Sequence, residues 1–197
     1  MKLTVKDCWN MAETERLRCY FPLERHSLVL DIGGYTGEWA SRMLDFYGCR
    51  MEVFEPVEEY ASAARRTLIG TGAHVHEFGL GAVCEERLIQ PDLDATQTQP
   101  GEDGSLFVRM ERAADAFERL SIRDADLMKV NIEGGEYELM PHLLDAGWLP
   151  RVRFLLIQWH RTGPWQAIGS LRQRIEQTHE LLWSFPWVWE AWQRVDQ

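Results

Sequence analysis

Apolar and polar residues alternate along this chain in a pattern that predicts strands and helices following one another. Short apolar runs rich in β-branched and aromatic residues predict five buried strands, at 27–32, 50–55, 73–78, 126–132 and 153–160. Apolar residues at helical spacing predict intervening helices over 38–47, 57–69, 112–120 and 136–146. Such alternation is typical of a mostly parallel sheet with helices on both faces, so we expect an α/β fold.

The remaining segments add to this core. Residues 1–25 have mixed polarity and predict a helical N-terminal extension, whereas residues 86–90 suit a short added strand. Segment 91–105 contains two prolines and two glycines without an apolar pattern, which predicts a flexible loop or lid. Near the C-terminus we expect a helix over 165–183 and a final, antiparallel strand over 186–192. No repeat or linker divides the chain, so one domain is expected.

Composition and charge narrow the function classes. The chain has 197 residues, 45% of them hydrophobic and 26% charged, as in ordinary globular proteins. Its net charge of −10 argues against a broad nucleic-acid-binding face, which requires clustered cations. No apolar run approaches the roughly 20 residues of a membrane span. The first ten residues lack the apolar segment of a secretory signal, so a cytoplasmic location without membrane contact is expected.

Four scattered cysteines and unclustered histidines give no metal-ligand spacing. The thiols are expected to be free and buried, and no metal site is predicted.

Polar residues and glycines gather where the predicted strands end, which is where α/β sheets bind ligands. The first strand runs into Asp31-x-Gly33-Gly34-x-x-Gly37. Glycines there permit a sharp turn and close ligand approach, although a tight turn without a ligand has the same pattern. No Gly-Lys-Ser/Thr follows, so a phosphate-binding P-loop is excluded, and the acidic Asp31 suits a cationic ligand.

The second and third strand ends also carry unusual residues. Glu55 can accept hydrogen bonds from both ribose hydroxyls of an adenosine, or it is a solvated residue before a turn proline. Lys129, Asn131 and Glu133 fall on one side of a buried strand, where unpaired polar groups are costly. Asn131 and Glu133 would either serve a ligand or only cap the next helix and close a turn.

Taken in order, the motifs DIGGYTG, VFEP, HEFGLGA, MKVNIEGGEYELM and LLIQWH resemble the FkbM-type S-adenosylmethionine-dependent methyltransferases over about residues 27–160. The resemblance implies a Rossmann-like class I methyltransferase fold with S-adenosylmethionine as cofactor. It places cofactor-binding residues at the ends of the strands predicted over 27–32, 50–55 and 126–132, and at the end of the strand predicted over 73–78. They are Asp31, Gly33, Gly34, Gly37, Glu55, Phe78, Gly79 and Asn131. Glu55 would hold the ribose, and Phe78 and Gly79 would lie beside the adenine. The family pattern has aspartate where this chain has Asn131.

Methyl transfer to a hydroxyl requires an aligned acceptor and benefits from a base. His160 is our first candidate base because its pKa suits neutral pH, Glu133 is the second, and Asn131 completes the catalytic set. His160 is equally compatible with a structural role. Glu133, Glu136 and His160 together offer cation ligands, but their spacing does not require a metal.

Five of the nine tryptophans lie between Trp165 and Trp192, either as core or as an aromatic wall for a sugar ring or planar acceptor. The resemblance favours O-methylation of a sugar, polysaccharide or natural-product hydroxyl, with a small-molecule or glycan partner and no nucleic acid.

Two alternatives to this function stay open. A catalytically silent adenosine-binding module is suggested by Asn131, and a nicotinamide-dependent oxidoreductase would instead show Gly-x-Gly-x-x-Gly. Oligomeric state is not predicted.

Overall fold

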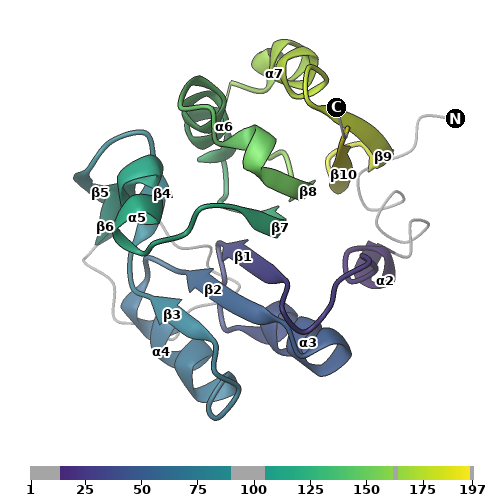
Figure 1. Cartoon of the computed structure of the whole chain (residues 1–197). Helices are drawn as coiled ribbons and strands as arrows, with labels where there is room; N and C mark the ends of the chain where they lie inside the picture. The colour runs from purple at the N-terminus through teal and green to yellow at the C-terminus, as the bar shows by residue number, and fades with distance from the viewer. Residues whose placement is uncertain (1–13, 90–104, 162–163, 196–197) are drawn as a thin grey trace, which may run out of the picture.

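A seven-stranded sheet forms the centre of the molecule (Figure 1). The computed structural model describes residues 14–89, 105–161 and 164–195. The strands of this sheet are β1 (Leu28–Ile32), β2 (Arg50–Phe54), β3 (His74–His76), β7 (Ala125–Val130), β8 (Val152–Ile157), β9 (His179–Phe185) and β10 (Trp189–Arg194). The helices are α2 (Thr14–Leu17), α3 (Glu38–Tyr47), α4 (Glu58–Thr67), α5 (Ala113–Arg119), α6 (Glu136–Asp145) and α7 (Ile168–Ile175), with 3-10 turns η2 (Leu149–Arg151) and η3 (Trp165–Ala167).

The sheet has the order β3-β2-β1-β7-β8-β10-β9. Neighbouring strands from β3 to β8 are parallel, and β10 is antiparallel to both β8 and β9. The chain leaves β1 toward β2 on one side and later returns to β7 on the other, so the strand order switches at β1. Ligands of open α/β sheets bind beyond the carboxyl ends of the strands at such a switch. The predicted α/β class and the antiparallel last strand are confirmed.

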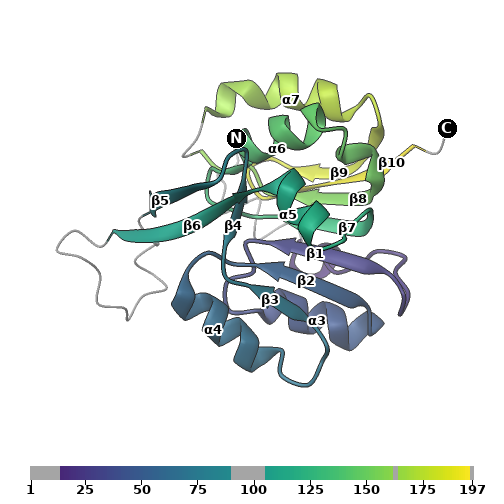
Figure 2. The same cartoon turned by 60° about the vertical axis from the view of Figure 1, so that its left-hand side comes forward.

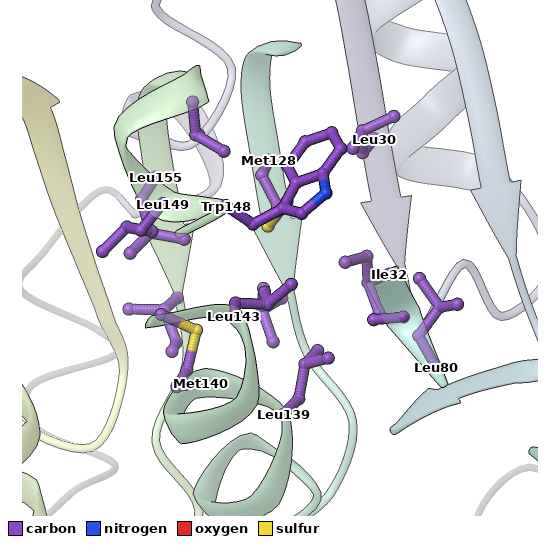
Figure 3. Packing of buried hydrophobic residues seen from close by; sticks show 14 of the residues in the cluster. Leu30, Ile32, Leu80, Met128, Leu139, Met140, Leu143, Trp148, Leu149 and Leu155 are labelled. Carbon is purple, nitrogen blue, oxygen red and sulfur yellow. The ribbon is translucent and has the colours of Figure 1, made fainter. Parts of the chain in front are cut away.

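Helices cover both faces because successive strand residues point to opposite sides. Leu30 and Ile32 of β1 join the cluster under α5, α6 and α7, whereas Val29 joins the cluster with Trp39 and Met43 of α3. Figure 3 shows part of the first cluster, where Leu139, Met140 and Leu143 of α6 lie over the sheet near Met128.

A small second sheet extends from the edge of the main one, in the order β4-β6-β5 (Figure 2). It consists of β4 (Gly79–Gly81), β5 (Glu85–Ile89) and β6 (Leu106–Arg112). The expected single strand over 73–78 is therefore shorter, since the chain leaves β3 at His76 and enters β4 three residues later. The added strand expected over 86–90 corresponds to β5, which pairs antiparallel with β6.

The C-terminal prediction requires correction. The expected helix over 165–183 is only η3 and α7, because residues 179–185 form strand β9. Pairing with β9 gives backbone hydrogen-bond partners to the outer edge of β10, which a helix over residues 179–185 would leave unpaired. The last strand is shifted from 186–192 to Trp189–Arg194, and residues 186–188 form the turn between the two strands.

Two other expected segments are described only in part. In the N-terminal extension predicted for residues 1–25, α2 covers Thr14–Leu17, and residues 18–25 contain no helix. The loop or lid predicted for 91–105 lies outside the described residues except for Ser105. Of the described cysteines, Cys19 and Cys49 are buried free thiols as expected, but Cys84 is exposed. Within the described part of the chain, no helix is both long and apolar enough to cross a bilayer.

Candidate active site

A cavity of about 660 Å³ opens at the carboxyl ends of β1, β2 and β7. Five of the residues predicted from the strand ends line it: Gly33, Glu55, Gly79, Asn131 and Glu133. Its remaining wall comes from α4 and the small second sheet. The cavity therefore lies at the switch in strand order, where the topology predicts a ligand.

Gly33 forms the floor of the turn after β1. Its φ of 82° lies in the left-handed region, and a Cβ built on it would sit 1.9 Å from the main-chain oxygen of Asn131. Both the Gly33 and Gly34 amides donate to the Phe54 carbonyl, which ties the turn to the end of β2. Only glycine therefore fits between these strand ends.

The other two glycines of the motif serve packing and do not line the cavity. A Cβ on Gly34 would lie 2.1 Å from Cγ1 of Val53, and one on Gly37 would lie 3.2 Å from Cα of Ala64 in α4. They allow the turn and the start of α3 to approach β2 and α4 closely.

Asp31 lies beneath the turn in a fully buried ion pair. Its Oδ1 is 2.5 Å from Nζ of Lys129, which also donates to the Gly33 carbonyl at 2.9 Å. Burial raises the pKa of the Asp31 carboxyl, and the Lys129 ammonium opposes that rise. The second carboxylate oxygen, Oδ2, is buried without a hydrogen-bond partner among the described residues. An orphaned acceptor is costly in an apolar setting. Asp31, predicted to bind the cofactor, does not line the cavity, and its contacts through Lys129 instead hold the turn.

Glu55 is held in one orientation by two main-chain amides. The Tyr35 amide donates to Oε2 at 2.8 Å and the Val57 amide to Oε1 at 3.0 Å, and the side chain is only 6% exposed. Burial raises the pKa of Glu55, while these two hydrogen bonds lower it. Each carboxylate oxygen keeps a further lone pair at the cavity, so both hydroxyls of a ribose can be accepted.

Replacing Glu55 with glutamine is expected to weaken binding of S-adenosylhomocysteine about tenfold, as titration calorimetry will show. The amide retains one acceptor oxygen and places an NH2 group against a main-chain amide, so one charge-assisted hydrogen bond is lost. Glu58→Gln, on the first turn of α4, is the matched control and should bind as wild type does. Equal affinities for the two variants would remove Glu55 from the ribose site.

The far wall of the cavity is apolar. Val57 and Tyr60 of α4 cluster with Val108 and Met110 of β6, and Tyr60 packs edge-on against Tyr35 with ring centroids 4.6 Å apart. Gly79 belongs here because a Cβ would meet the Met110 sulfur at 2.5 Å. This wall suits a planar, weakly polar ring such as adenine.

Phe78 does not line the cavity. Its ring is buried against Phe54, with centroids 5.7 Å apart, and against the guanidinium groups of Arg109 and Arg119. The structure thus keeps Gly79 beside the cavity and turns Phe78 into the core.

Tyr35, Tyr60, Arg87 and Met110 are among the lining residues that sequence reasoning missed. Tyr35 lies within the motif after β1, at a position that the glycine pattern leaves open to any residue. Arg87 is held by Glu85 and Glu138, at 2.5 and 2.7 Å. Tyr60, Arg87 and Met110 reach the cavity only through long-range packing of α4 and the second sheet, for which no local pattern exists.

His160 lies between two carboxylates just beyond β8. Its Nδ1 is 2.8 Å from Glu136, which is fully buried and also accepts the amides of Ile132 and Gly134. Its Nε2 is 3.2 Å from the Glu133 carboxylate, which lines the cavity. Burial lowers the pKa of His160, but the hydrogen bonds to Glu133 and Glu136 outweigh it and raise the pKa to about 9. The histidine is therefore a cation at neutral pH.

The reciprocal effect acts on Glu133, whose pKa is lowered by its hydrogen bond to His160. Asn131 adds a buried side-chain oxygen without a hydrogen-bond partner among the described residues. Of the three predicted catalytic residues, Asn131 and Glu133 line the cavity, and His160 lies behind them, hydrogen-bonded to Glu133. In the described ranges, no group of histidine, cysteine and carboxylate side chains has the geometry of a metal site.

A sheet of this order, with a glycine turn, an acid at the second strand end and a cavity beside both, defines a class I S-adenosylmethionine-dependent methyltransferase. The model of the methyltransferase FkbM domain matches residues 31–182, and the chain belongs to that family. The residues present fit the cofactor: Gly33 lines the cavity without a side chain, Glu55 can accept hydrogen bonds from ribose hydroxyls, and the apolar wall suits adenine.

Solved structures share the fold at low sequence identity. An rRNA methylase of Streptococcus thermophilus has 11% identity and a TM-score of 0.57, with 98% of this chain and 100% of that chain covered. A Clostridium thermocellum protein proposed to be an rRNA methylase has 8% identity and a TM-score of 0.55, covering 95% and 96%. A Streptococcus pneumoniae protein proposed to be a tRNA methyltransferase, in complex with S-adenosyl-L-methionine, has 12% identity and a TM-score of 0.54, covering 94% and 73%. Among proteins of curated function, no sequence matches the chain significantly.

Proposed function

We propose that the protein methylates a hydroxyl oxygen of a sugar, polysaccharide or natural product, with Glu133 as the base. The observation that carries the proposal is the position of the Glu133 carboxylate, in the cavity wall and fixed by the protonated His160. Because His160 is already charged, it is assigned to hold Glu133 in place rather than to take up a proton.

When bound, S-adenosylmethionine supplies an electrophilic methyl carbon. The cofactor would donate this methyl group to the acceptor oxygen and would leave as S-adenosylhomocysteine. The Glu133 carboxylate takes up the proton of the acceptor hydroxyl. Asn131 orients the reacting groups through its side-chain oxygen, which has no hydrogen-bond partner among the described residues. This oxygen can accept a hydrogen bond from the hydroxyl to be methylated or from the ammonium group of the cofactor. An amide provides no net charge at this position, so Glu133 is the remaining acid–base group of the predicted set.

Replacing Glu133 with glutamine is expected to lower the rate of methyl transfer about 100-fold or more, the usual contribution of a positioned base. The measurement follows S-adenosylhomocysteine release with hydroxylated acceptors, and calorimetry with the same cofactors shows whether binding is intact. Glu118→Gln, an exposed carboxylate of α5 outside the cavity lining, is the control for a general loss of charge. Full activity of the Glu133 variant would overturn its role as base.

The same assays separate the competing functions. All three structural neighbours described above have names that refer to RNA, so an RNA transcript is included as an acceptor. The net charge of −10 favours the smaller acceptors. Methylation of RNA alone would replace the proposed acceptor class, binding of S-adenosylhomocysteine without any turnover would favour a silent module, and a preference for NAD would favour an oxidoreductase.

A further inference from the structure

Two tryptophans and an arginine form an exposed cluster at the same edge of the sheet as the cavity. The Arg161 guanidinium carbon lies 4.5 Å from the ring centroid of Trp187, and the Trp165 ring packs edge-on against Trp187 with centroids 6.2 Å apart. Trp187 is half-buried against the main core, whereas Trp165 is 48% exposed. Trp187 thus anchors the cluster, and the exposed ring of Trp165 is its open surface.

The sheet register places this cluster at the end of β8, which also carries His160. β10 is antiparallel to β8 with Glu190 opposite Ile157, so the β9–β10 turn that carries Trp187 lies where β8 ends. Arg161 directly follows His160, which is hydrogen-bonded to the cavity residue Glu133. The cluster therefore continues the edge of the site beyond Glu133, away from the Glu55 end where the ribose is expected.

Charge distinguishes Arg161 from the arginine inside the cavity. Arg87 is paired with two carboxylates, at 2.5 and 2.7 Å, and its charge is already compensated. Arg161 has no carboxylate partner among the described residues and is exposed, with its charge directed onto the Trp187 ring. A protein with a net charge of −10 repels anions over most of its surface, so an exposed cation without a carboxylate partner in the described residues is a favourable place for an anion.

The backbone conformation of Trp187 is unusual for a bulky residue. Trp187 has a φ of 64°, in the left-handed region that bulky residues rarely occupy. Such a conformation costs free energy and persists only where its surroundings hold it. In this conformation the indole ring of Trp187 contacts both Arg161 and Trp165.

We propose that Arg161 and Trp165 bind the methyl acceptor, and that this acceptor is a hydroxylated ring bearing a carboxylate or phosphate group. The ring stacks on Trp165, and the anionic group pairs with the Arg161 guanidinium. This inference rests on the proposed function, because it identifies the acceptor of that same site.

Calorimetry on the full chain loaded with S-adenosylhomocysteine tests it. The probes are an oligogalacturonate and its neutral methyl ester, glucose 1-phosphate and neutral methyl glucoside, and a short RNA. At least one anionic probe is expected to bind about tenfold or more tightly than its neutral counterpart, the effect of one charge-assisted hydrogen bond. Arg161→Met should abolish that preference. Trp165→Leu should weaken the charged and neutral probes alike, about fivefold, and Trp165→Phe should restore part of the loss.

Arg174→Met is the matched control, because Arg174 is a partly exposed cation of α7 that pairs with Asp145. It should leave the preference unchanged, and all variants should bind S-adenosylhomocysteine as wild type does. Equal binding of charged and neutral probes, a preference that survives Arg161→Met, or binding of RNA alone would overturn the proposal. Failure to bind S-adenosylhomocysteine, or activity that survives Glu133→Gln, would instead count against the proposed function.

Discussion

Replacing Lys129 with methionine is expected to lower the free energy of unfolding by about 3–5 kcal/mol, the usual cost of breaking a buried ion pair. The ammonium is 4% exposed and contacts both Asp31 and the Gly33 carbonyl, so its loss leaves a buried carboxylate and a carbonyl without a donor. For a chain of this size the midpoint of thermal unfolding should fall by about 10 °C. Chemical denaturation at pH 7 gives the free energy, and calorimetry gives the midpoint.

Two further variants test whether the loss comes from the buried ion pair. Arg153→Met removes a cation from the neighbouring strand β8, but its pair with Asp126 is 4.0 Å long and solvent-exposed, so less than about 1 kcal/mol is expected. The double change Asp31→Asn with Lys129→Met removes both charges and should recover part of the loss. If Lys129→Met costs no more than Arg153→Met, the pair does not stabilise the turn.

The central strands could be predicted because buried parallel strands are continuous apolar runs. The C-terminal strand β9 could not. Leu171, Ile175 and Trp183 continue a helix-compatible spacing, and nothing local marks the point where the helix ends. The chain instead pairs residues 179–185 with β10, and only the position of that partner strand decides between the two conformations.

The residues of the site likewise include some that the sequence predicts and some that it does not. Gly33, Glu55, Asn131 and Glu133 follow strands directly, so the rule that ligands bind at strand ends is enough to find them. Met110 reaches Gly79 only because β6 pairs with β4, although residues 80–109 lie between the two partners, and the sequence contains no signal for that pairing. The protonation state of His160 was equally out of reach, since it depends on two carboxylates placed within 3.2 Å by the fold.

Because His160 is protonated, the free energy of unfolding should fall as the pH rises. A buried neutral histidine would give the opposite pH dependence. The pKa of His160 rises from 6.5 to about 9 on folding, so the folded chain holds a proton that the unfolded chain releases. The stabilisation is complete below pH 6.5 and is lost as the pH rises through about 9. The full shift corresponds to about 3 kcal/mol. Because Glu133 is 64% exposed and its pair is screened by solvent, we expect about 2 kcal/mol.

The measurement is the free energy of unfolding from pH 6.5 to 9.5, in wild type and in His160→Gln. Burial also raises the pKa values of the Cys49 thiol and the Tyr137 hydroxyl, and both contribute toward the alkaline end. They are present in both proteins, so the difference between the two curves isolates His160. Wild type should lose its advantage over the variant as the pH rises. Glu133→Gln, which leaves Glu136 in place, should show an intermediate slope. Parallel curves for wild type and His160→Gln would mean that His160 is neutral, and would return it to the position of candidate base.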